Sequence, residues 1–336
     1  MNLIERILGP VGVMPTNQLN AILPDELVMR VGVPHRGGEL ALHAHKQGYA
    51  AMVSASAFFD AKAGKFKVPD VTVLNDINFS LDSAGYSAIL GWKSKGPQAG
   101  MASVFPWGYA DYISFASQMN PAWWSQPDLC CEPEIAANQA EVDWRVRATA
   151  TLLFGVLEIL YEWQKQLSKD TDASTIAMML RPPVPVLQGR RVSDYLTSLE
   201  MMLEVWNYWA SMGEPGSPWL APPALIGIGS VCRRDLNDPE EGLFAILAGL
   251  EGKIPPGCML HLFGVKGAAL KKVKMLPFVA SCDSMAYDFG ARIEARERGI
   301  SNNMEHRTAV MTRWMETAGE MMRAKAGDQF RLDFHA

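Results

Sequence analysis

Short apolar runs of strand length recur along the whole chain, and stretches with helical periodicity separate most of them. About eight such runs alternate with helices over 336 residues, which favours an α/β fold, a parallel (β/α)8 barrel of the TIM type. A doubly wound sheet is the alternative, but no GxGxxG sequence follows the first run. The predicted strands are residues 27–33, 50–56, 71–76 or 78–82, 125–131, 184–188, 224–230, 259–265 and 276–283.

The intervals between these runs predict helices and a single domain. The clearest helical patterns cover residues 38–50, 134–168, 193–212 and 238–252. No proline-, glycine- or serine-rich linker divides the chain, so we expect one domain over residues 1–336. The last ~50 residues have the pattern of two helices, and residues 300–336 are expected to form a helical C-terminal extension of the barrel.

Composition excludes several classes of protein. With 49% hydrophobic and 20% charged residues, the chain can bury a large core. No apolar run reaches the roughly 18 residues of a membrane span, and the N-terminus lacks a signal-peptide pattern, so we expect no membrane partner and a cytoplasmic location. The five cysteines have no CxxC spacing, which predicts neither a disulfide framework nor a zinc knuckle. A net charge of −5 argues against a uniformly basic surface, although a local basic face can still attract a polyanion.

Polar and small residues gather where the predicted strands end. In a (β/α)8 barrel these carboxyl ends carry the active site. Glycine lets a flat ligand approach the backbone, while Gln and Asp offer the paired donors and acceptors that a nucleobase edge requires. We therefore expect one mouth formed by Asp82, Asp128, Gln188–Gly189, Gly227–Gly229, Phe263–Gly264 and Asp283.

The ordered motifs around these positions resemble the tRNA-guanine transglycosylase superfamily. Over residues 78–290 the chain reads DSAGY, PDLCCEP, VLQG, GIGSV, HLFGV and SCDS in that order. The resemblance implies a barrel enzyme, a pentosyl-transferring glycosyltransferase, that exchanges guanine in a nucleic acid for a 7-deazaguanine base. It also implies a covalent glycosyl-enzyme intermediate, as in retaining glycosidases.

The same resemblance assigns roles to individual residues. Asp283 matches the nucleophile that attacks C1′ of the target nucleotide. Asp82 matches the general acid and base that protonates the departing guanine and deprotonates the incoming base. The expected base-binding residues are Asp128 and Gln188 at the Watson–Crick edge, the Gly229 backbone at the exocyclic oxygen, and Tyr86 and Phe263 at the faces of the base. Gly189 and Gly264 are expected to bind the substrate as well.

Two departures from the family pattern affect the substrate and the cofactor. The family's DSGG is DSAG here, with Ala84 in place of glycine. The CxCxxC zinc motif that follows the nucleophile in the family is missing, so we expect no cofactor and no bound metal. This loss favours the DNA-acting branch of phages and genomic islands, which would place the protein in the cytoplasm of a host cell. The expected partners are DNA and a preQ0-like base, and a homo-oligomer is compatible with the family.

Basic residues follow several of the strand ends and would give an acidic protein one positive face. Phosphate contacts fit this placement, although solvated helix starts would give the same pattern. The predicted contacts are Lys93, Lys95, Arg190, Arg191, Arg233, Arg234 and Lys266.

Other interpretations stay open at this point. Base exchange on tRNA is the nearest alternative, followed by a non-catalytic nucleic-acid-binding subunit and by an unrelated barrel enzyme acting on a small molecule. Asp82, Asp128 and Asp283 could instead cap helices or turns, and Tyr86 and Phe263 could be core residues. Cys232, Cys258, His261 and Cys282 lie near neighbouring late strands and could form a mixed Cys/His metal site, although single cysteines on buried strands are usually inert.

Overall fold

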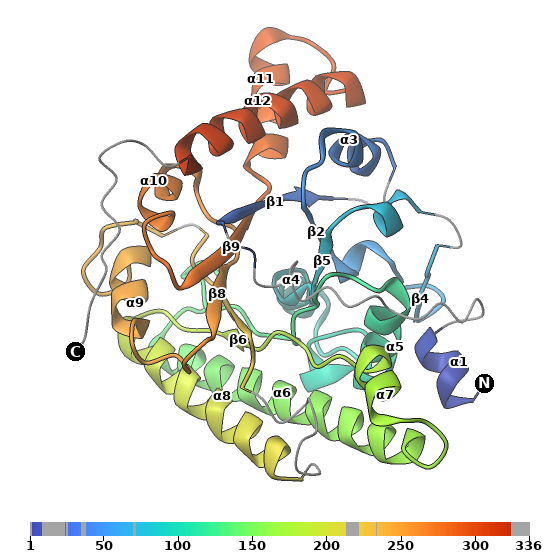
Figure 1. The fold of residues 1–336 in the computed structure, drawn as a ribbon. Helices are drawn as coiled ribbons and strands as arrows, with labels where there is room; N and C mark the ends of the chain where they lie inside the picture. Colours follow the sequence, from blue (N-terminus) through green and yellow to red (C-terminus); the bar gives the residue numbers. More distant parts are fainter. Residues whose placement is uncertain are drawn as a thin grey trace.

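Seven parallel strands form one curled sheet at the centre of the molecule, with helices around it (Figure 1). The structure is a computed structural model of the chain, and it describes residues 2–8, 24, 26–34, 38–69, 72–212, 222–232 and 234–323. The strands are β1 (Val28–Val33), β2 (Ala51–Ser54), β5 (Phe79–Asp82), β6 (Val186–Leu187), β7 (Leu225–Ile228), β8 (Met259–Leu262) and β9 (Val279–Ser284). Their order in the sheet is β5-β2-β1-β9-β8-β7-β6.

The predicted strand at 125–131 is wrong, because only isolated bridges at Trp124 and Ser125 connect this part of the chain with the two edges of the sheet. Isolated parallel bridges pair Leu81 of β5 with Trp124, and Ser125 with Val184. Gln126 N still donates to Val184 O at 2.9 Å. Beyond it the backbone ladder stops, because Pro127 has no N–H to donate and the Gln126 side-chain Oε1 atom accepts from Val186 N at 3.1 Å. The structure thus shows a parallel half-barrel, and a complete (β/α)8 barrel is not confirmed.

The remaining strand predictions agree with the structure in position, although several strands are shorter. The alternatives at 71–76 and 78–82 resolve in favour of the second, which is β5. Val73–Asp76 is a 3-10 turn in which the Thr72 side chain accepts from Leu74 N at 3.2 Å. A two-stranded antiparallel hairpin, β3 (Phe59–Asp60) and β4 (Lys65–Phe66), was not predicted.

The four predicted helical patterns are confirmed, and two helices follow the last strand. No helix in the described ranges is both long and apolar enough to cross a membrane. Residues 324–336 of the predicted extension lie outside the described chain. The helices are α1 (Leu3–Leu8), α3 (Glu39–Gln47), α4 (Gly85–Lys95), α5 (Tyr109–Met119), α6 (Gln139–Leu167), α7 (Ala173–Met179), α8 (Val192–Met212), α9 (Leu243–Leu250), α10 (Leu270–Val273), α11 (Ala286–Arg298) and α12 (Met304–Met322).

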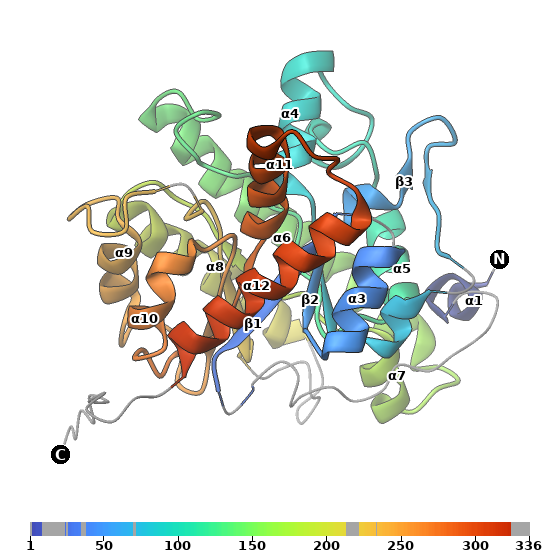
Figure 2. The ribbon, with the colours of Figure 1, turned by 90° about the horizontal axis from the view of Figure 1, so that it is seen from above.

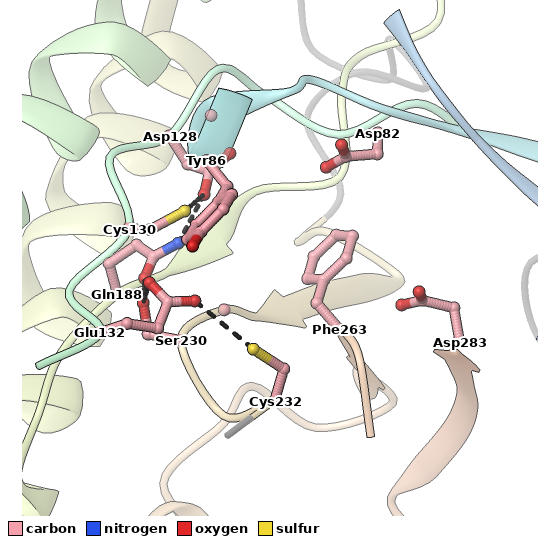
Figure 3. Close-up of a pocket in the computed structure, with 12 residues that line it drawn as sticks. Asp82, Tyr86, Asp128, Cys130, Glu132, Gln188, Ser230, Cys232, Phe263 and Asp283 are labelled. Carbon is pink, nitrogen blue, oxygen red and sulfur yellow. Dashed lines mark hydrogen bonds between the residues drawn. The ribbon is translucent and has the colours of Figure 1, made fainter. Parts of the chain in front are cut away.

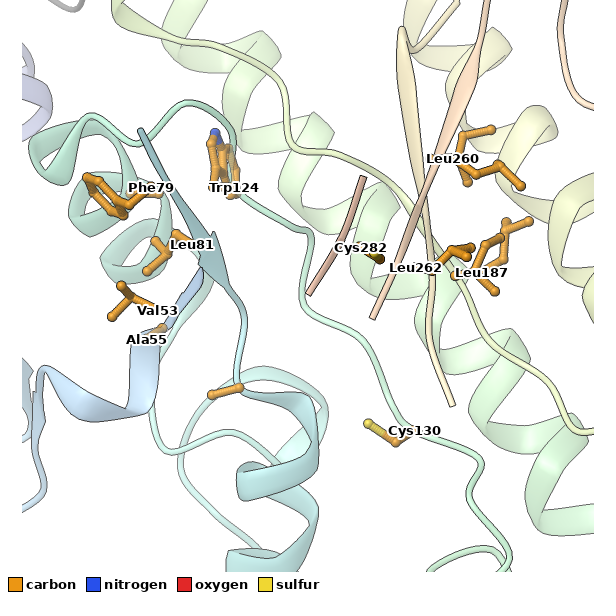
Figure 4. Packing of buried hydrophobic residues seen from close by; sticks show 14 of the residues in the cluster. Val53, Ala55, Phe79, Leu81, Trp124, Cys130, Leu187, Leu260, Leu262 and Cys282 are labelled. Atoms are coloured by element: carbon orange, nitrogen blue, oxygen red, sulfur yellow. The ribbon is translucent and has the colours of Figure 1, made fainter. Parts of the chain in front are cut away.

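The sheet separates two clusters of the core, because strand side chains alternate between its two faces. Residues such as Val53, Leu81 and Leu262 face the surrounding helices and belong to the large cluster, part of which Figure 4 shows. A smaller cluster joins residues of strands that are not neighbours, so it fills the inside of the curl. Its members are Met52, Ala122, Trp123, Val184, Leu225 and Ala280, with Met259 and Phe263 packed against them. A third, small cluster lies at the start of α6 and consists of Cys131, Ala136, Val142 and Val146.

Candidate active site

A cavity of about 210 Å³ lies at the carboxyl ends of the strands and is lined by most of the predicted site residues (Figure 3). This volume suits a ligand smaller than the drug-sized molecules that occupy sites of about 300–1,000 Å³. Gly189 and Gly264 are not in the lining but lie next to it. The lining residues are Asp82, Gly85, Tyr86, Asp128, Cys130, Glu132, Gln188, Gly229, Ser230, Cys232, Phe263 and Asp283.

A tight strand-to-helix turn places Asp82 in the cavity. β5 ends at Asp82, whose Oδ2 atom accepts a hydrogen bond from Ala84 N at 3.0 Å. Ala84 has a positive φ of 68°, and Gly85 then begins α4, which brings Tyr86 to the cavity. A Cβ at Gly85 would collide with the carbonyl oxygen of Asp128, so only glycine lets the start of α4 approach this wall so closely.

The surroundings of Asp82 favour its protonated form. Burial is the largest effect, and together with the charge of Asp128 it raises the pKa of Asp82 to about 7. The hydrogen bond from Ala84 N opposes this shift, and the charge of Asp283 adds a smaller increase. A carboxyl group with a pKa near neutrality can give and take a proton at physiological pH, which is what a general acid and base requires.

Asp128, Gln188 and Ser230 form one wall of hydrogen-bonded polar groups, although they come from distant parts of the chain. The Asp128 carboxylate accepts from Ser83 Oγ at 2.6 Å and from Gln188 Nε2 at 2.5 Å. Ser230 Oγ donates to Gln188 Oε1 at 2.5 Å. Burial raises the pKa of Asp128 to about 6, an effect that the donors on Ser83 and Gln188 oppose. Both Asp128 oxygens are therefore fixed in direction.

Glu132 extends this wall, and the sequence analysis did not assign it a role. Its Oε2 atom lies 3.2 Å from Ser230 Oγ, and its Oε1 atom lies 3.7 Å from the Cys232 sulfur. Burial raises the pKa of Glu132. Since Ser230 has one hydroxyl proton, which Gln188 receives, the Glu132 contact is best satisfied when Glu132 is protonated and donates. The motifs PDLCCEP and GIGSV contain Glu132 and Ser230, but nothing in their spacing shows that the two side chains meet.

Gly229 lines the cavity, yet its backbone groups are already used. Its N–H donates to Leu187 O at 3.0 Å, and its carbonyl accepts from the Tyr195 hydroxyl at 2.6 Å. A Cβ at Gly229 would collide with the Gln188 amide. The predicted contact between the Gly229 N–H and an exocyclic oxygen therefore does not fit, and the absence of a side chain at Gly229 serves the packing of Gln188 instead.

Two aromatic rings, Tyr86 and Phe263, enter the cavity from different elements (Figure 3). Tyr86 lies on the first turn of α4, and Phe263 follows β8. Both are half-buried. The Phe263 ring packs over Gly227 of β7, where a Cβ would lie 2.5 Å from its Cε2 atom. Flat rings that keep exposed surface inside a cavity can stack on a planar ligand.

Asp283 lies near the end of β9, a strand whose residues are all buried. Its Oδ1 atom accepts from Gly264 N at 2.9 Å and lies 3.3 Å from His261 Nε2. Gly264 has a positive φ of 68°, a backbone conformation that glycine adopts without strain. Arg30 of β1 pairs with Asp283 in register. The carboxylate thus has its own donors and reaches the cavity from the side opposite the polar wall (Figure 3).

The predicted phosphate contacts divide into exposed and structural residues. Lys93 and Lys95 are exposed at the end of α4. Arg190 and Arg191 both pair with Glu241, at 3.2 and 3.8 Å. The remaining members are Arg233, which lies outside the described residues, Lys266, which is exposed and donates to Arg234 O at 2.7 Å, and Arg234 itself.

Arg234 does not fit the predicted role. Its side chain is buried, and its guanidinium donates to the carbonyl oxygens of Gly189, Arg190, Ser230 and Glu241. A guanidinium with these partners holds the loops after β6 and β7 together and has no free face for a phosphate.

Gly189 is needed for packing, because a Cβ at this position would lie 2.8 Å from Asp194 Cβ.

Within the described ranges, no group of three or more His, Cys, Asp and Glu side chains could hold a metal ion. The expectation that the protein needs no cofactor remains a prediction.

The comparison with known families agrees with this geometry. The sequence pattern of DpdA, described as DeoxyPurine in DNA protein A, matches residues 67–324. The chain belongs to the DpdA family. This family of DNA 7-deazaguanine transglycosylases is related to the tRNA-guanine transglycosylases, so the predicted resemblance is confirmed and implies a transglycosylase-type activity in DNA modification. A comparison with curated proteins found no match. The matched range contains every lining residue of the cavity.

Proposed function

We propose that this DpdA-family protein exchanges guanine in DNA for a 7-deazaguanine base through a covalent aspartyl-glycosyl intermediate. The observation that carries the proposal is the shared cavity of Asp82 and Asp283, one a carboxyl group with a pKa of about 7 and the other a carboxylate held by donors from a neighbouring strand. A pair of carboxyl groups in different surroundings is the arrangement that a retaining displacement at an anomeric carbon requires.

In the first half-reaction an oxygen of Asp283 bonds to C1′ of the target nucleotide as the bond from C1′ to the guanine nitrogen breaks. The bonding electron pair leaves with the base, and protonated Asp82 supplies the proton that makes guanine a neutral leaving group. In the second half-reaction ionised Asp82 removes the ring N–H proton of the incoming base. Its nitrogen then bonds to C1′ and releases the Asp283 carboxylate, so both residues return to their starting states.

The polar wall would select the base. Guanine and 7-deazaguanine both present an N–H and an exocyclic amine on their Watson–Crick edge, and these are donors that the fixed oxygens of Asp128 can accept. Gln188, held by Ser230, offers its second amide hydrogen to the exocyclic oxygen. Tyr86 and Phe263 would stack on the faces of the base. Because a cavity of about 210 Å³ has no space for a base pair, the target nucleotide must leave the stack, at a cost of a few kcal/mol.

The proposal is tested by base exchange with purified protein. preQ0 is offered with duplex DNA and, separately, with tRNA, and mass spectra of the digested nucleosides show where the base was incorporated. We expect a deazaguanine deoxynucleoside with DNA, and a loss of roughly a thousandfold or more in Asp283→Asn, which retains shape but cannot form the glycosyl ester. Asp143→Asn, the same change on the exposed surface of α6, is the matched control.

Three other outcomes of this experiment would contradict parts of the proposal. Incorporation into tRNA alone would replace DNA by tRNA as the substrate. An Asp283→Asn variant with full activity, and a folded state equal to that of the parent by circular dichroism, would remove Asp283 as the nucleophile. A protein that binds DNA without exchanging any base would be a binding subunit.

A further inference from the structure

His261 is completely buried next to the carboxylate of Asp283. Its side chain has no exposed surface, and its ring meets the rings of Trp123 and Phe263 edge to face, with centroid distances of 4.7 and 4.6 Å. These two contacts fix the plane of the imidazole. The direction of both ring nitrogens is therefore set by packing and not by solvent.

A register shift between β8 and β9 brings His261 to this place. Leu260 pairs with Val279, but the next residue, His261, pairs with Ser281 and skips Ala280. In a regular ladder His261 would lie opposite Ala280. Irregularities of this kind re-aim side chains and are common beside active sites. Here the shift places one ring nitrogen on Ser281 and the other on Asp283.

The proton positions on the ring follow from its two partners. Nδ1 lies 2.8 Å from Ser281 Oγ, and Nε2 lies 3.3 Å from Asp283 Oδ1. A carboxylate oxygen can only accept, so the tautomer with the proton on Nε2 is the one that satisfies Asp283, and the Ser281 hydroxyl then donates to Nδ1. Burial lowers the pKa of His261, which keeps the ring neutral.

The two oxygens of Asp283 consequently differ. Oδ1 receives the N–H of Gly264 and the Nε2 proton of His261. Oδ2 accepts no hydrogen bond from any described part of the chain, and the side chain keeps 12% of its surface exposed, toward the cavity. A carboxylate oxygen with free lone pairs is the better nucleophile, since a hydrogen-bonded oxygen must first lose its donors.

We propose that His261, oriented by Ser281, is a positioning residue that holds Oδ1 of Asp283 so that Oδ2 is the atom that bonds to C1′. The inference rests on the proposed function and adds to it the choice of attacking oxygen. In the step, the bond from Oδ2 to C1′ forms while the bond from C1′ to the base breaks, and Asp82 supplies the proton. His261 transfers no proton and touches no substrate atom; it limits the rotation of the carboxylate.

Two substitutions of His261 separate positioning from packing. His261→Gln places an amide nitrogen near the former Nε2 and retains a donor for Asp283. His261→Asn places its amide near the former Nδ1, so it retains the contact with Ser281 and loses the one with Asp283. Both variants lose the ring contacts of the imidazole with Trp123 and Phe263. A difference between the two variants therefore reports the lost hydrogen bond and not the lost packing.

The readout is the single-turnover rate of the covalent adduct between protein and DNA on denaturing gels, together with KM for the incoming base. We expect His261→Asn to slow adduct formation on the order of 100-fold with KM changed less than about threefold, because a displaced nucleophile affects the bond-forming step. His261→Gln should recover most of the rate. Ser281→Ala, which removes the donor to Nδ1, should slow the step several-fold.

Equal rates for the Gln and Asn variants, with thermal unfolding showing both folded, would overturn the positioning role. An effect on KM alone would overturn it as well, because it would make His261 a base-binding residue. If either variant does not fold, Ser281→Ala decides, and an unchanged rate would refute the inference. A parent protein that forms no adduct and exchanges no base would instead refute the proposed function, which keeps the two failures apart.

Discussion

Two strand-to-helix corners carry the proposed chemistry, and they are built in different ways. At the corner between β5 and α4, Asp82 receives its backbone hydrogen bond from Ala84, within its own turn. At the corner between β9 and α11, Asp283 receives its donors from Gly264 and His261, which follow or belong to the neighbouring strand β8. The first carboxyl group takes its backbone donor from its own turn, with a further side-chain contact from Ser54 of β2, whereas both donors of the second come from another part of the chain.

The difference explains how one residue type can serve two roles. Asp82 lies close to another carboxyl group, that of Asp128, and receives few hydrogen bonds, so its pKa is raised to about 7. Asp283 is pinned at one oxygen and open at the other. Surroundings that differ in this way separate an acid from a nucleophile in other enzymes with paired carboxyl groups. The comparison can be tested by changing one corner at a time.

Among changes to the first corner, the largest effect is expected from Asp82→Asn, which preserves the shape of this corner and removes its exchangeable proton. Base exchange should fall by roughly 10²- to 10⁴-fold, the usual contribution of a general acid or base. Exchange is measured as preQ0 incorporation into DNA. Asp76→Asn, at the end of the 3-10 turn before β5, is the matched control. A variant with unchanged exchange would show that the first corner handles no proton.

The same variant should remove the part of the pH dependence of stability that comes from Asp82. In the folded protein the pKa of Asp82 is raised to about 7 from 3.8, so between these values the folded state holds a proton that the unfolded chain has released. The free energy of unfolding then falls as pH rises through this window, by up to roughly 4 kcal/mol at about 1.4 kcal/mol per unit. Urea unfolding at pH 5 and pH 8 should show Asp82→Asn gaining stability relative to the parent at pH 8. If the difference in free energy of unfolding between Asp82→Asn and the parent is the same at pH 5 and pH 8, the raised pKa of Asp82 is contradicted.

Gly85→Ala should disturb the first corner by a steric clash, without changing any charge. A Cβ there collides with the Asp128 carbonyl, so the wall or the helix must move, and we expect a loss of about 1–3 kcal/mol in the free energy of unfolding with weaker base binding. Gly91→Ala lies on the same helix with no atom within 4 Å and should instead stabilise by about 0.5–1 kcal/mol. Similar losses in both variants would mean that helix propensity, and not the close approach, decides.

The smallest effect concerns DNA binding at the end of α4. Figure 2 shows α4 and α11 projecting from the same side of the molecule, and α7 on the opposite side. Replacing Lys93 and Lys95 by alanine should weaken DNA binding a few-fold and reduce the slope of log K against log salt by about 0.9 per lost phosphate contact. The control pair, Lys165 and Lys169, lies between the last turn of α6 and α7. If the slope of log K against log salt is the same for both double variants, Lys93 and Lys95 make no phosphate contacts.

Much of the site could be predicted because strand ends are local signals. An apolar run that stops at a polar residue marks Asp82, Gln188 and Asp283 without any knowledge of the fold. Their convergence follows from parallel pairing, which places every carboxyl end on one face.

The rest depends on contacts that no local pattern encodes. His261 lies within an apolar strand, and only the register shift beside it directs the ring at Asp283. Glu132 joins the wall through Ser230, 98 residues away. Arg234 looks like a surface cation in sequence, but four carbonyl groups surround it in the fold. The segment 125–131 has the composition of a strand, yet a side-chain amide takes over its pairing at Gln126.

The left-handed backbone at Ala84 gives the first corner a further property. Alanine costs about 1–2 kcal/mol in this conformation, where glycine costs almost nothing, and the chain has alanine where the related motif has glycine. A glycine would relax the turn but would also let the peptide that bonds to Asp82 rotate more freely. The methyl group thus lowers the free energy of unfolding and narrows the range of directions open to the Asp82 carboxylate, so selection for a more heat-resistant protein would favour glycine here at the expense of the proposed proton transfer.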